Sequence, residues 1–249
     1  MKWDLQAFDV LDSTNEEIRR RAETGVAEGL AVLARQQTAG RGRRGRAWES
    51  PVGNLYLSLL LRPQLGGKPA SPAQAATLSF LTVVALAEAV ELAAPQLGPA
   101  ITCKWPNDLL VGGAKIAGIL LESRTRPDGN LDWVTVGIGV NLAHYPEQTP
   151  YPATALAAHG VSVAPEDFAP WLLARYGYWY GRWQAGGFAP VREAWLKKAQ
   201  GLGKPVVVRL PDRELHGRFA ALDDSGALLL EMPDGRMQTV TAGDVFPAG

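Results

Sequence analysis

The sequence predicts an α+β protein in which helices pack on a mixed β-sheet and a small β-barrel follows. Helix and strand patterns are interspersed over residues 1–200. Three consecutive strand patterns, Leu109–Val111, Lys115–Ser123 and Leu131–Val140, are joined by Gly-Gly and Pro-Asp-Gly turns, which favours antiparallel pairing. Residues 201–249 hold five short strand patterns, and these predict the barrel.

The N-terminal part begins with a strand that ends near Phe8–Leu11 and continues with a helix. Ser13 and Glu16 have the spacing of a capping box, in which the Ser13 hydroxyl accepts from the Glu16 amide and the Glu16 carboxylate reaches back. Gly25 is a suitable left-handed end for this helix. The next expected elements are a strand at Leu30–Arg35, a loop at Gln36–Gly53, a strand at Asn54–Leu61 and a helix from Ser71 to about Ala94.

At Gly201–Gly203 the expected elements change from helices to short strands. This change predicts a boundary between two domains, residues 1–200 and 201–249. Two or three helices are expected between Ala153 and Gln200, and their aromatic side chains are interpreted as core packing. These aromatic residues are Trp171, Tyr176, Trp179, Trp183 and Trp195. The strands expected after the boundary are Pro205–Leu210, Leu215–Leu222, Ala227–Glu231, Arg236–Thr241 and Val245–Phe246.

Composition excludes several classes of protein. The 249 residues carry 25 basic and 25 acidic side chains, so the chain lacks the positive excess of a general nucleic-acid or membrane-surface binder. The single cysteine, Cys103, rules out an intrachain disulfide and fits a reducing compartment. The N-terminus shows no secretory signal, and the apolar stretch Leu78–Val90 is expected to fall short of a membrane span. Three dispersed histidines do not have the spacing of a zinc site.

A loop rich in glycine and arginine is the strongest local signal. Gly40–Arg46 holds four arginines in seven residues. It matches the G-x-G-x-x-G pattern, but Pro51 and Gly53 follow and no helix begins, which argues against a dinucleotide site. Glycine lets a ligand approach the backbone, and arginine binds phosphate or carboxylate oxygens, so the loop suits a polyanion such as a nucleoside triphosphate. A solvated basic loop and a nucleic-acid contact remain alternatives.

Two further segments hold polar groups beside apolar strands. Lys115 lies inside an apolar strand, where it snorkels, pairs or faces a ligand, and an exposed lysine on an edge strand is the alternative. Strict alternation puts Gly118 on the opposite face. Asn107 and Asp108 either shape a turn or supply a polar contact and a metal carboxylate. Gly137–Asn141 combines two glycines, which permit close approach, with an asparagine that can bind a base or a ribose.

Taken together, these segments resemble the biotin protein ligase family. The residues that carry the resemblance are Asp12–Asn15, Gln37, Gly40–Arg46, Trp48, Lys104–Leu109, Lys115–Leu120, Glu122 and Gly137–Asn141. The resemblance spans roughly residues 8–246. It implies a catalytic fold similar to class II aminoacyl-tRNA synthetases and an SH3-like C-terminal barrel. The chain begins just before the Ser-Thr-Asn element, so we expect no N-terminal DNA-binding domain and no DNA partner.

The resemblance also implies the reaction and the site. Biotin and ATP would form biotinyl-5′-AMP with release of pyrophosphate, and a lysine of a biotin carboxyl carrier protein or domain, of acetyl-CoA carboxylase or a related carboxylase, would then take the biotin. The residues assigned to catalysis are Lys115, Arg41 and Arg43. Those assigned to biotin are Ser13, Thr14, Asn15, Gln37, Arg41, Gly42, Arg43, Lys115 and Gly118. Those assigned to ATP are Arg41, Arg43, Arg46, Trp48, Asn107, Lys115 and Asn141, and Asp108 is the expected Mg²⁺ ligand.

Several points stay open at the level of sequence. The rival within the same fold is a lipoate–protein ligase or an octanoyltransferase, and the latter would need Cys103 as nucleophile. The rival from another class is a non-catalytic RNA-binding module that uses Gly40–Arg46. We expect a cytoplasmic protein without a membrane partner, and a homodimer is one of the oligomeric states left open. Residues 39–50 are expected to be disordered or open without ligand and to order over biotinyl-AMP, because glycines are frequent there and the charges are crowded.

Overall fold

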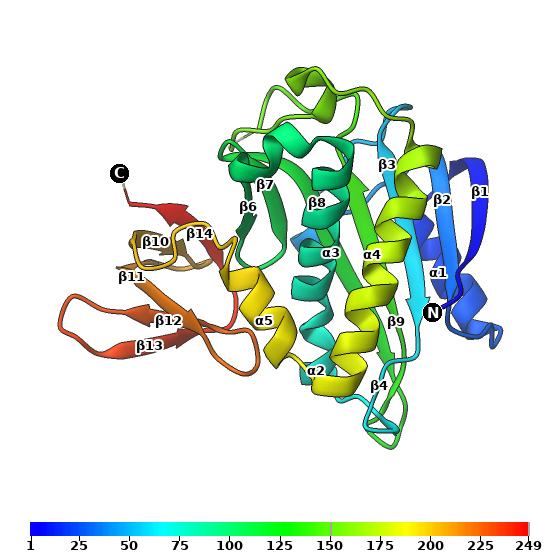
Figure 1. Cartoon of the computed structure of the whole chain (residues 1–249). Helices are drawn as coiled ribbons and strands as arrows, with labels where there is room; N and C mark the ends of the chain where they lie inside the picture. The colour runs from blue at the N-terminus through cyan, green and yellow to red at the C-terminus, as the bar shows by residue number, and fades with distance from the viewer. Residues whose placement is uncertain (150, 249) are drawn as a thin grey trace.

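A computed structural model describes residues 1–149 and 151–248 of the chain. Figure 1 shows a large part, in which helices cover a β-sheet, and a smaller β-rich part that holds the C-terminus. All strands of the large sheet lie between Asp4 and Val140, and those of the smaller sheet lie between Pro205 and Pro247. The α+β architecture expected from the sequence is therefore confirmed.

The large sheet has seven strands and is mixed. Its spatial order is β1 (Asp4–Leu11), β2 (Leu30–Gln37), β3 (Leu55–Leu61), β9 (Leu131–Val140), β8 (Ala114–Thr125), β7 (Asp108–Val111) and β6 (Ile101–Lys104). Only β1 and β2 pair in parallel, and every other neighbouring pair is antiparallel. The predicted hairpins around Gly112–Gly113 and Asp128–Gly129 are confirmed.

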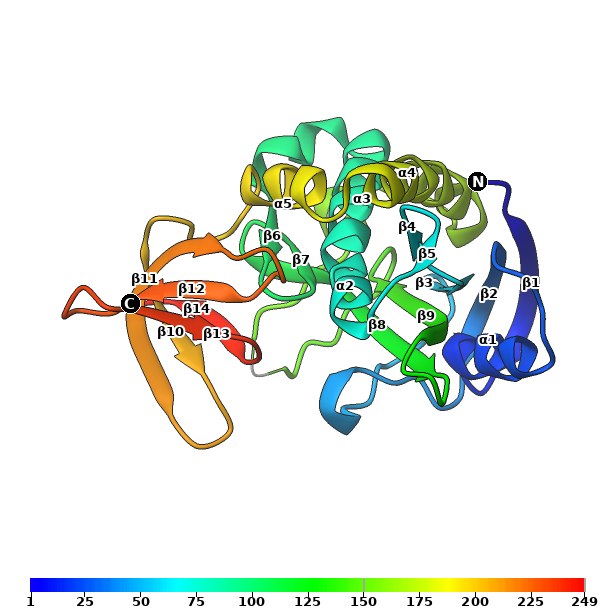
Figure 2. The same cartoon turned by 90° about the horizontal axis from the view of Figure 1, so that it is seen from below.

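Helices cover both faces of this sheet unequally. One face carries α2 (Pro72–Ala76), α3 (Leu78–Ala93), α4 (Pro165–Gly186) and α5 (Ala189–Leu196). The other face carries α1 (Thr14–Glu23), which contacts β2, β3 and β9 and lies across the sheet from α3 and α4 in Figure 2. The less covered face therefore leaves room for a site beside α1.

Helix α3 is the centre of the core because most of its residues are apolar and buried. It packs against α4, α5 and three strands of the large sheet. The predicted apolar stretch Leu78–Val90 lies inside a longer segment, Pro72–Ala93, which has a mean hydropathy of 1.7 and by length and composition alone could cross a membrane. In the structure 72% of this apolar window is buried. The apolar run is therefore explained by the protein core.

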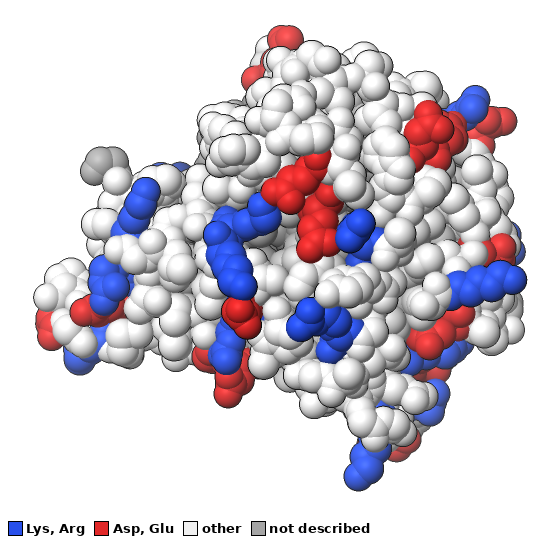
Figure 3. All heavy atoms as spheres, viewed as in Figure 1, with Lys and Arg blue, Asp and Glu red and all other residues white. Residues whose placement is uncertain are grey.

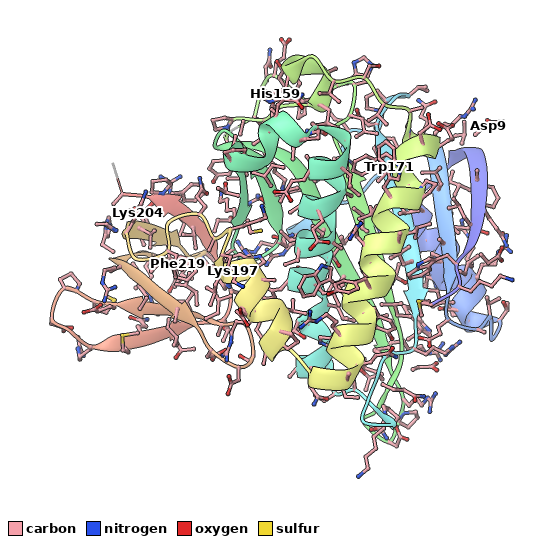
Figure 4. All side chains as sticks on the ribbon, viewed as in Figure 1. Asp9, His159, Trp171, Lys197, Lys204 and Phe219 are labelled. Carbon is pink, nitrogen blue, oxygen red and sulfur yellow. The ribbon has the colours of Figure 1, made fainter. Side chains whose placement is uncertain are left out.

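Three local predictions need correction. Ser13 is at the N-cap of α1, but its side chain makes no capping bond, and Glu16 bonds to Arg19 at 2.8 Å instead. The helix from Ser71 to Ala94 is broken at Thr77, whose hydroxyl bonds back to the Gln74 carbonyl. Trp171 is 39% exposed and lies on the outer side of α4 in Figure 4. The other aromatic residues expected in the core, Tyr176, Trp179, Trp183 and Trp195, are buried as predicted.

The C-terminal sheet has five antiparallel strands in the order β13 (Met237–Val240), β12 (Leu228–Glu231), β11 (Glu214–Leu222), β10 (Pro205–Arg209) and β14 (Asp244–Pro247). Two buried side-chain contacts attach this sheet to the large part. The Trp105 indole donates to the Gly226 carbonyl at 3.0 Å. Phe219 lies next to α5 in Figure 4, with its ring centre 6.4 Å from that of Trp195. These buried contacts hold the two parts together.

The remaining described elements are short: the hairpin β4 (Gln64–Leu65) and β5 (Lys68–Pro69), and the 3-10 turns Arg43–Gly45, Pro95–Ala100 and Leu156–His159. The helix-covered surface in Figure 3 carries interspersed acidic and basic side chains, with no large field of one sign. This distribution agrees with the balanced charge of the chain.

Candidate active site

A cavity of about 410 Å³ opens beside the start of α1. Its walls come from the first residues of α1, the loop of residues 39–50, strands β8 and β9, and one residue of β14. We call residues 39–50 the flap. The cavity brings together every residue that the sequence assigned to a site: Ser13, Thr14, Asn15, Gln37, Arg41, Gly42, Arg43, Arg46, Trp48, Asn107, Asp108, Lys115, Gly118 and Asn141.

A chain of buried polar groups forms one end of the cavity. The Gln37 side-chain oxygen accepts from the Thr14 amide at 2.8 Å and lies 3.1 Å from the Thr14 hydroxyl. The Ser58 hydroxyl lies 2.7 Å from the Thr14 hydroxyl and 2.6 Å from the Asn15 side-chain oxygen. Thr14, Asn15 and Ser58 are almost fully buried, so each depends on a neighbouring side chain for a partner. Sequence reasoning missed Ser58, whose only signal is a serine inside an apolar strand.

The two glycines of β9 let side chains lie directly against the strand. A Cβ on Gly137 would come within 2.3 Å of the Asn15 side-chain oxygen. A Cβ on Gly139 would come within 2.6 Å of the Trp48 indole. The close approach expected from the sequence is thus present, and the groups that approach are Asn15 and Trp48 of the same chain.

The predicted opposite orientation of Lys115 and Gly118 is wrong. The pairing of β7 with β8 shifts register between Leu109 and Leu110, so that Ile116 forms a bulge. A Cβ on Gly118 would lie 3.1 Å from the Lys115 ammonium nitrogen. Because the extra residue breaks strict alternation, both positions face the cavity.

Each cation in the cavity has a partner within the protein. Lys115 pairs with Asp108 at 2.7 Å, and its nitrogen lies 5.6 Å from the centre of the Trp48 ring. Arg43 donates to the Asn107 side-chain oxygen at 2.8 Å, and burial lowers the pKa of this guanidinium from its ordinary value. The cations are therefore held close together by polar groups that were not assigned to this task from the sequence.

The flap is folded over the cavity. Its backbone turns at Arg43–Gly45, where Arg44 takes a left-handed conformation with φ of 56°, and the Gly42 amide donates to the Arg46 carbonyl at 2.7 Å. Arg44 and Arg46 approach Asp244 of β14 at 3.8 and 3.5 Å. The C-terminal part thus contributes a carboxylate to the site, and sequence reasoning assigned no residue there.

Both predicted ATP-binding asparagines also hold the protein's own backbone. The Asn107 amide nitrogen donates to the Ile119 carbonyl at 2.6 Å. The Asn141 amide nitrogen donates to the Thr154 carbonyl at 3.0 Å. Both side chains line the cavity, but these bonds mean that each also fixes a cavity wall.

Several carboxylates lie in or beside the cavity. Glu49, Asp108 and Asp244 line it, and Glu122 and Glu16 lie next to Arg41 at 3.2 and 3.4 Å. Within residues 1–149 and 151–248 no group of three His, Cys, Asp or Glu side chains is arranged to hold a metal ion. A cation such as Mg²⁺, which typically takes one or two protein carboxylates and fills its remaining positions with phosphate oxygens and water, would still find a protein ligand in Asp108.

Comparison with known proteins places this site in context. A family model described as the biotin/lipoate A/B protein ligase family matches residues 7–141, and a biotin protein ligase C-terminal domain model matches residues 201–246. A curated biotin–[acetyl-CoA-carboxylase] ligase from Paracoccus denitrificans is 46% identical over 247 residues, which cover 96% of this chain and 98% of the relative.

Two further similarities agree with the family match. The bifunctional ligase/repressor BirA of Escherichia coli (strain K12) is 33% identical over 97% of this chain and 73% of the relative's length. A biotin protein ligase from Aquifex aeolicus, solved in complex with biotin and ATP, superimposes with a TM-score of 0.80 at 28% identity, covering 98% of this chain and 97% of that one.

Replacing Gly137 by alanine tests the close approach of Asn15 to β9. We expect Gly137→Ala to displace Asn15 and to destabilise the protein by about 1–3 kcal/mol, because the buried hydrogen bonds of Asn15 are lost. Gly181→Ala is the matched control, since a Cβ at that helical glycine meets nothing within 4 Å. Urea unfolding measures both variants, and equal free energies of unfolding would contradict the proposed crowding at Gly137.

The reactivity of Cys103 tests whether the chain contains a thiol nucleophile. Cys103 is fully buried on β6, and burial raises the pKa of its thiol to about 12. At pH 8 we expect iodoacetamide to alkylate the native protein roughly a thousandfold more slowly than the urea-unfolded protein, because the thiolate is the reactive form. Mass spectrometry follows the modification, and rapid labelling of the native protein would restore the transferase alternative.

Proposed function

Because the chain belongs to the biotin/lipoate A/B protein ligase family, we propose that it is an ATP-dependent biotin–protein ligase of the biotin–[acetyl-CoA-carboxylase] ligase type. The first reaction joins biotin to the α-phosphate of ATP, giving biotinyl-5′-AMP and pyrophosphate. The second transfers the biotinyl group to a lysine amine of an acceptor protein, with AMP as the leaving group.

One observation carries this proposal at the level of the site. A single cavity holds a buried polar cluster at one end and the cations Lys115, Arg41 and Arg43 along its walls. Biotin has the matching polarity, with a ureido ring at one end and a carboxylate at the other. The cavity volume of about 410 Å³ is within the range of small-molecule sites.

The first reaction brings two anions together. A carboxylate and an α-phosphate about 4 Å apart repel each other by about 4 kcal/mol at an effective dielectric constant near 20. Lys115 and the arginines of the flap would offset this repulsion, with Lys115 on the biotin carboxylate and the bridging oxygen, and Arg41 and Arg43 on phosphate and carboxylate oxygens. The biotin carboxylate is itself the nucleophile, so no side chain has to form a covalent intermediate.

The polar cluster would recognise the ureido ring. Thr14 and Asn15 offer hydroxyl and amide groups whose orientations are fixed by Gln37 and Ser58. Ser13, which lines the same end, adds a third hydroxyl or amide group. A ligand that leaves one of these buried groups unpaired would lose about 1–3 kcal/mol of binding free energy. Gly118 supports the same site by leaving space for the ligand beside Lys115.

The flap would hold ATP and protect the intermediate. Trp48 would cover the adenine, Arg46 would contact phosphate, and Asn107 and Asn141 would support the nucleotide side of the cavity. Mg²⁺, bound mainly by phosphate oxygens and by Asp108, would neutralise the charge of pyrophosphate. Since Asp108 pairs with Lys115, binding of the nucleotide and Mg²⁺ would redistribute this pair. Gly42 lets the flap backbone come close to the ligand.

The alternatives are less well supported. An octanoyltransferase needs an accessible cysteine, whereas Cys103 is buried in the core and does not line the cavity. A lipoyl chain has no ureido group to satisfy the polar cluster. The RNA-binding alternative does not account for the buried polar end of the cavity.

We also propose the cellular setting. The acceptor would be the biotin carboxyl carrier protein or domain of acetyl-CoA carboxylase or a related carboxylase, in agreement with the name of the Paracoccus denitrificans relative. The protein would act in the cytoplasm, where ATP is available and a lone thiol stays reduced. DNA binding is not part of the proposed activity, and a homodimer is compatible with it.

The adenylation reaction tests the proposal directly. After incubation with biotin, ATP and Mg²⁺, the denatured wild-type protein should release biotinyl-AMP that mass spectrometry detects. Lys115→Gln should lower the rate of pyrophosphate exchange roughly 10²–10³-fold, because a transition-state cation is lost while Asp108 keeps a polar partner. Lys197→Gln, an exposed lysine on the far side of the sheet, is the control and should exchange normally. Normal exchange by Lys115→Gln would remove Lys115 from the mechanism.

Hydrogen exchange tests closure of the flap. We expect backbone amides of residues 39–50 to gain at least about tenfold protection when biotinyl-AMP binds, because its phosphate and acyl carbonyl oxygens would accept hydrogen bonds from the flap arginines. Amides of α3 serve as the internal reference, since this helix is buried in both states. Identical protection of the flap with and without the intermediate would show that it does not close.

A further inference from the structure

Glu122 connects the buried polar end of the cavity with the flap, two parts of the site that come from separate segments of the sequence. It lies on β8 directly opposite Thr135 of β9. One carboxylate oxygen accepts from the Asn15 side-chain amide at 2.8 Å. An amino nitrogen of Arg41 lies 3.2 Å from both carboxylate oxygens. The same carboxylate therefore touches the buried polar end of the cavity and the flap.

On its first side, Glu122 fixes the orientation of Asn15. An ionised carboxylate only accepts hydrogen bonds, so the Asn15 amide must present its nitrogen to Glu122 and its oxygen to the Ser58 hydroxyl at 2.6 Å. Asn15 is only 4% exposed and lies against Gly137, so it has little freedom to rotate. Removal of the Glu122 acceptor would leave a buried N–H group without this partner.

On its second side, Glu122 restrains the flap. Arg41 is a flap residue, and its other carboxylate contact, with Glu16, is longer at 3.4 Å. Glu16 is also engaged by Arg19 at 2.8 Å, whereas Glu122 has no second arginine or lysine within 4 Å in the described part of the chain. Glu122 is therefore the carboxylate best placed to draw the flap toward β8.

We propose that Glu122 is a positioning residue that couples biotin recognition to flap closure. Its carboxylate orients Asn15 for the ureido ring and holds Arg41 where the flap covers the intermediate. This inference rests on the proposed function, because it assigns Asn15 to biotin and the flap to retention of biotinyl-AMP. Glu122 itself touches neither reacting group in this scheme and acts through the two residues that it holds.

Two substitutions distinguish the contact of Glu122 with Asn15 from its contact with Arg41. Glu122→Gln keeps an oxygen that accepts from Asn15 but loses the charge that attracts Arg41. We expect the KM for biotin to stay within about twofold of the wild-type value, while preformed biotinyl-AMP escapes about fivefold faster, because only the charge-assisted contact weakens. Glu122→Ala loses both contacts and should also raise the KM for biotin about tenfold, with the KM for ATP unchanged.

Escape is measured by diluting the purified enzyme–intermediate complex and timing the appearance of free biotinyl-AMP, and the two KM values come from pyrophosphate exchange normalised to active enzyme. Glu23→Gln is the matched control, since this exposed α1 carboxylate also pairs with an arginine. It should leave all three quantities unchanged.

Several outcomes would overturn the proposal. A wild-type escape rate in both Glu122 variants would show that the flap does not depend on this carboxylate. Equal increases in the KM for biotin and for ATP in Glu122→Ala would indicate a general structural role. If Glu122→Ala fails to fold, the escape rate of biotinyl-AMP from the nearly isosteric Glu122→Gln variant tests the proposal by itself, and a wild-type rate would overturn it. A wild-type protein that forms no biotinyl-AMP would defeat the proposed function, whereas unaffected variants of an active wild-type protein would defeat only the role of Glu122.

Discussion

The site depends on keeping several cations close together in a partly buried cavity. Such groups repel each other, and burial disfavours their charged forms. Every one of these cations has a polar partner: Asp108 for Lys115, Asn107 for Arg43, Glu122 and Glu16 for Arg41, and a shared Asp244 for Arg44 and Arg46. Asp108 is only seven residues from Lys115, but Asn107, Glu122 and Asp244 lie 64 or more residues from the arginines they contact, so tertiary structure brings these pairs together.

The sheet provides the rigid part of this arrangement, and the flap provides the adaptable part. Strands β8 and β9 carry Lys115, Gly118, Gly137 and Gly139 on a surface that cannot move far, because α3 and α4 pack on the opposite face. The flap connects β2 to β3, and its side chains contact both this surface and β14. In the proposed reaction, a cation on a rigid strand combined with a covering loop would suit an intermediate that must be kept from water.

The C-terminal sheet takes part in the site through its last strand. Phe246 of β14 stacks on Tyr151 with ring centres 4.7 Å apart, and the Lys104 ammonium lies 4.2 Å from the Phe246 ring. Two residues earlier on the same strand, Asp244 faces the flap arginines. The contact that attaches β14 to the larger part thus also fixes the position of a carboxylate at the cavity.

The sequence alone predicted the main elements and most of the residues that line the cavity, because strands, turns and the Gly-Arg loop leave local signals. Apolar periodicity and turn residues located most strands and helices within a few residues, and the Gly-Arg loop, Lys115 and the glycines of β9 all line one cavity as expected. Tertiary structure alone decided the partners and the orientations. The bulge at Ile116, which turns Gly118 toward Lys115, depends on the pairing of β7 with β8. The roles of Ser58, Glu122 and Asp244 arise from contacts across 43 or more residues, and such distances leave no pattern in a single sequence.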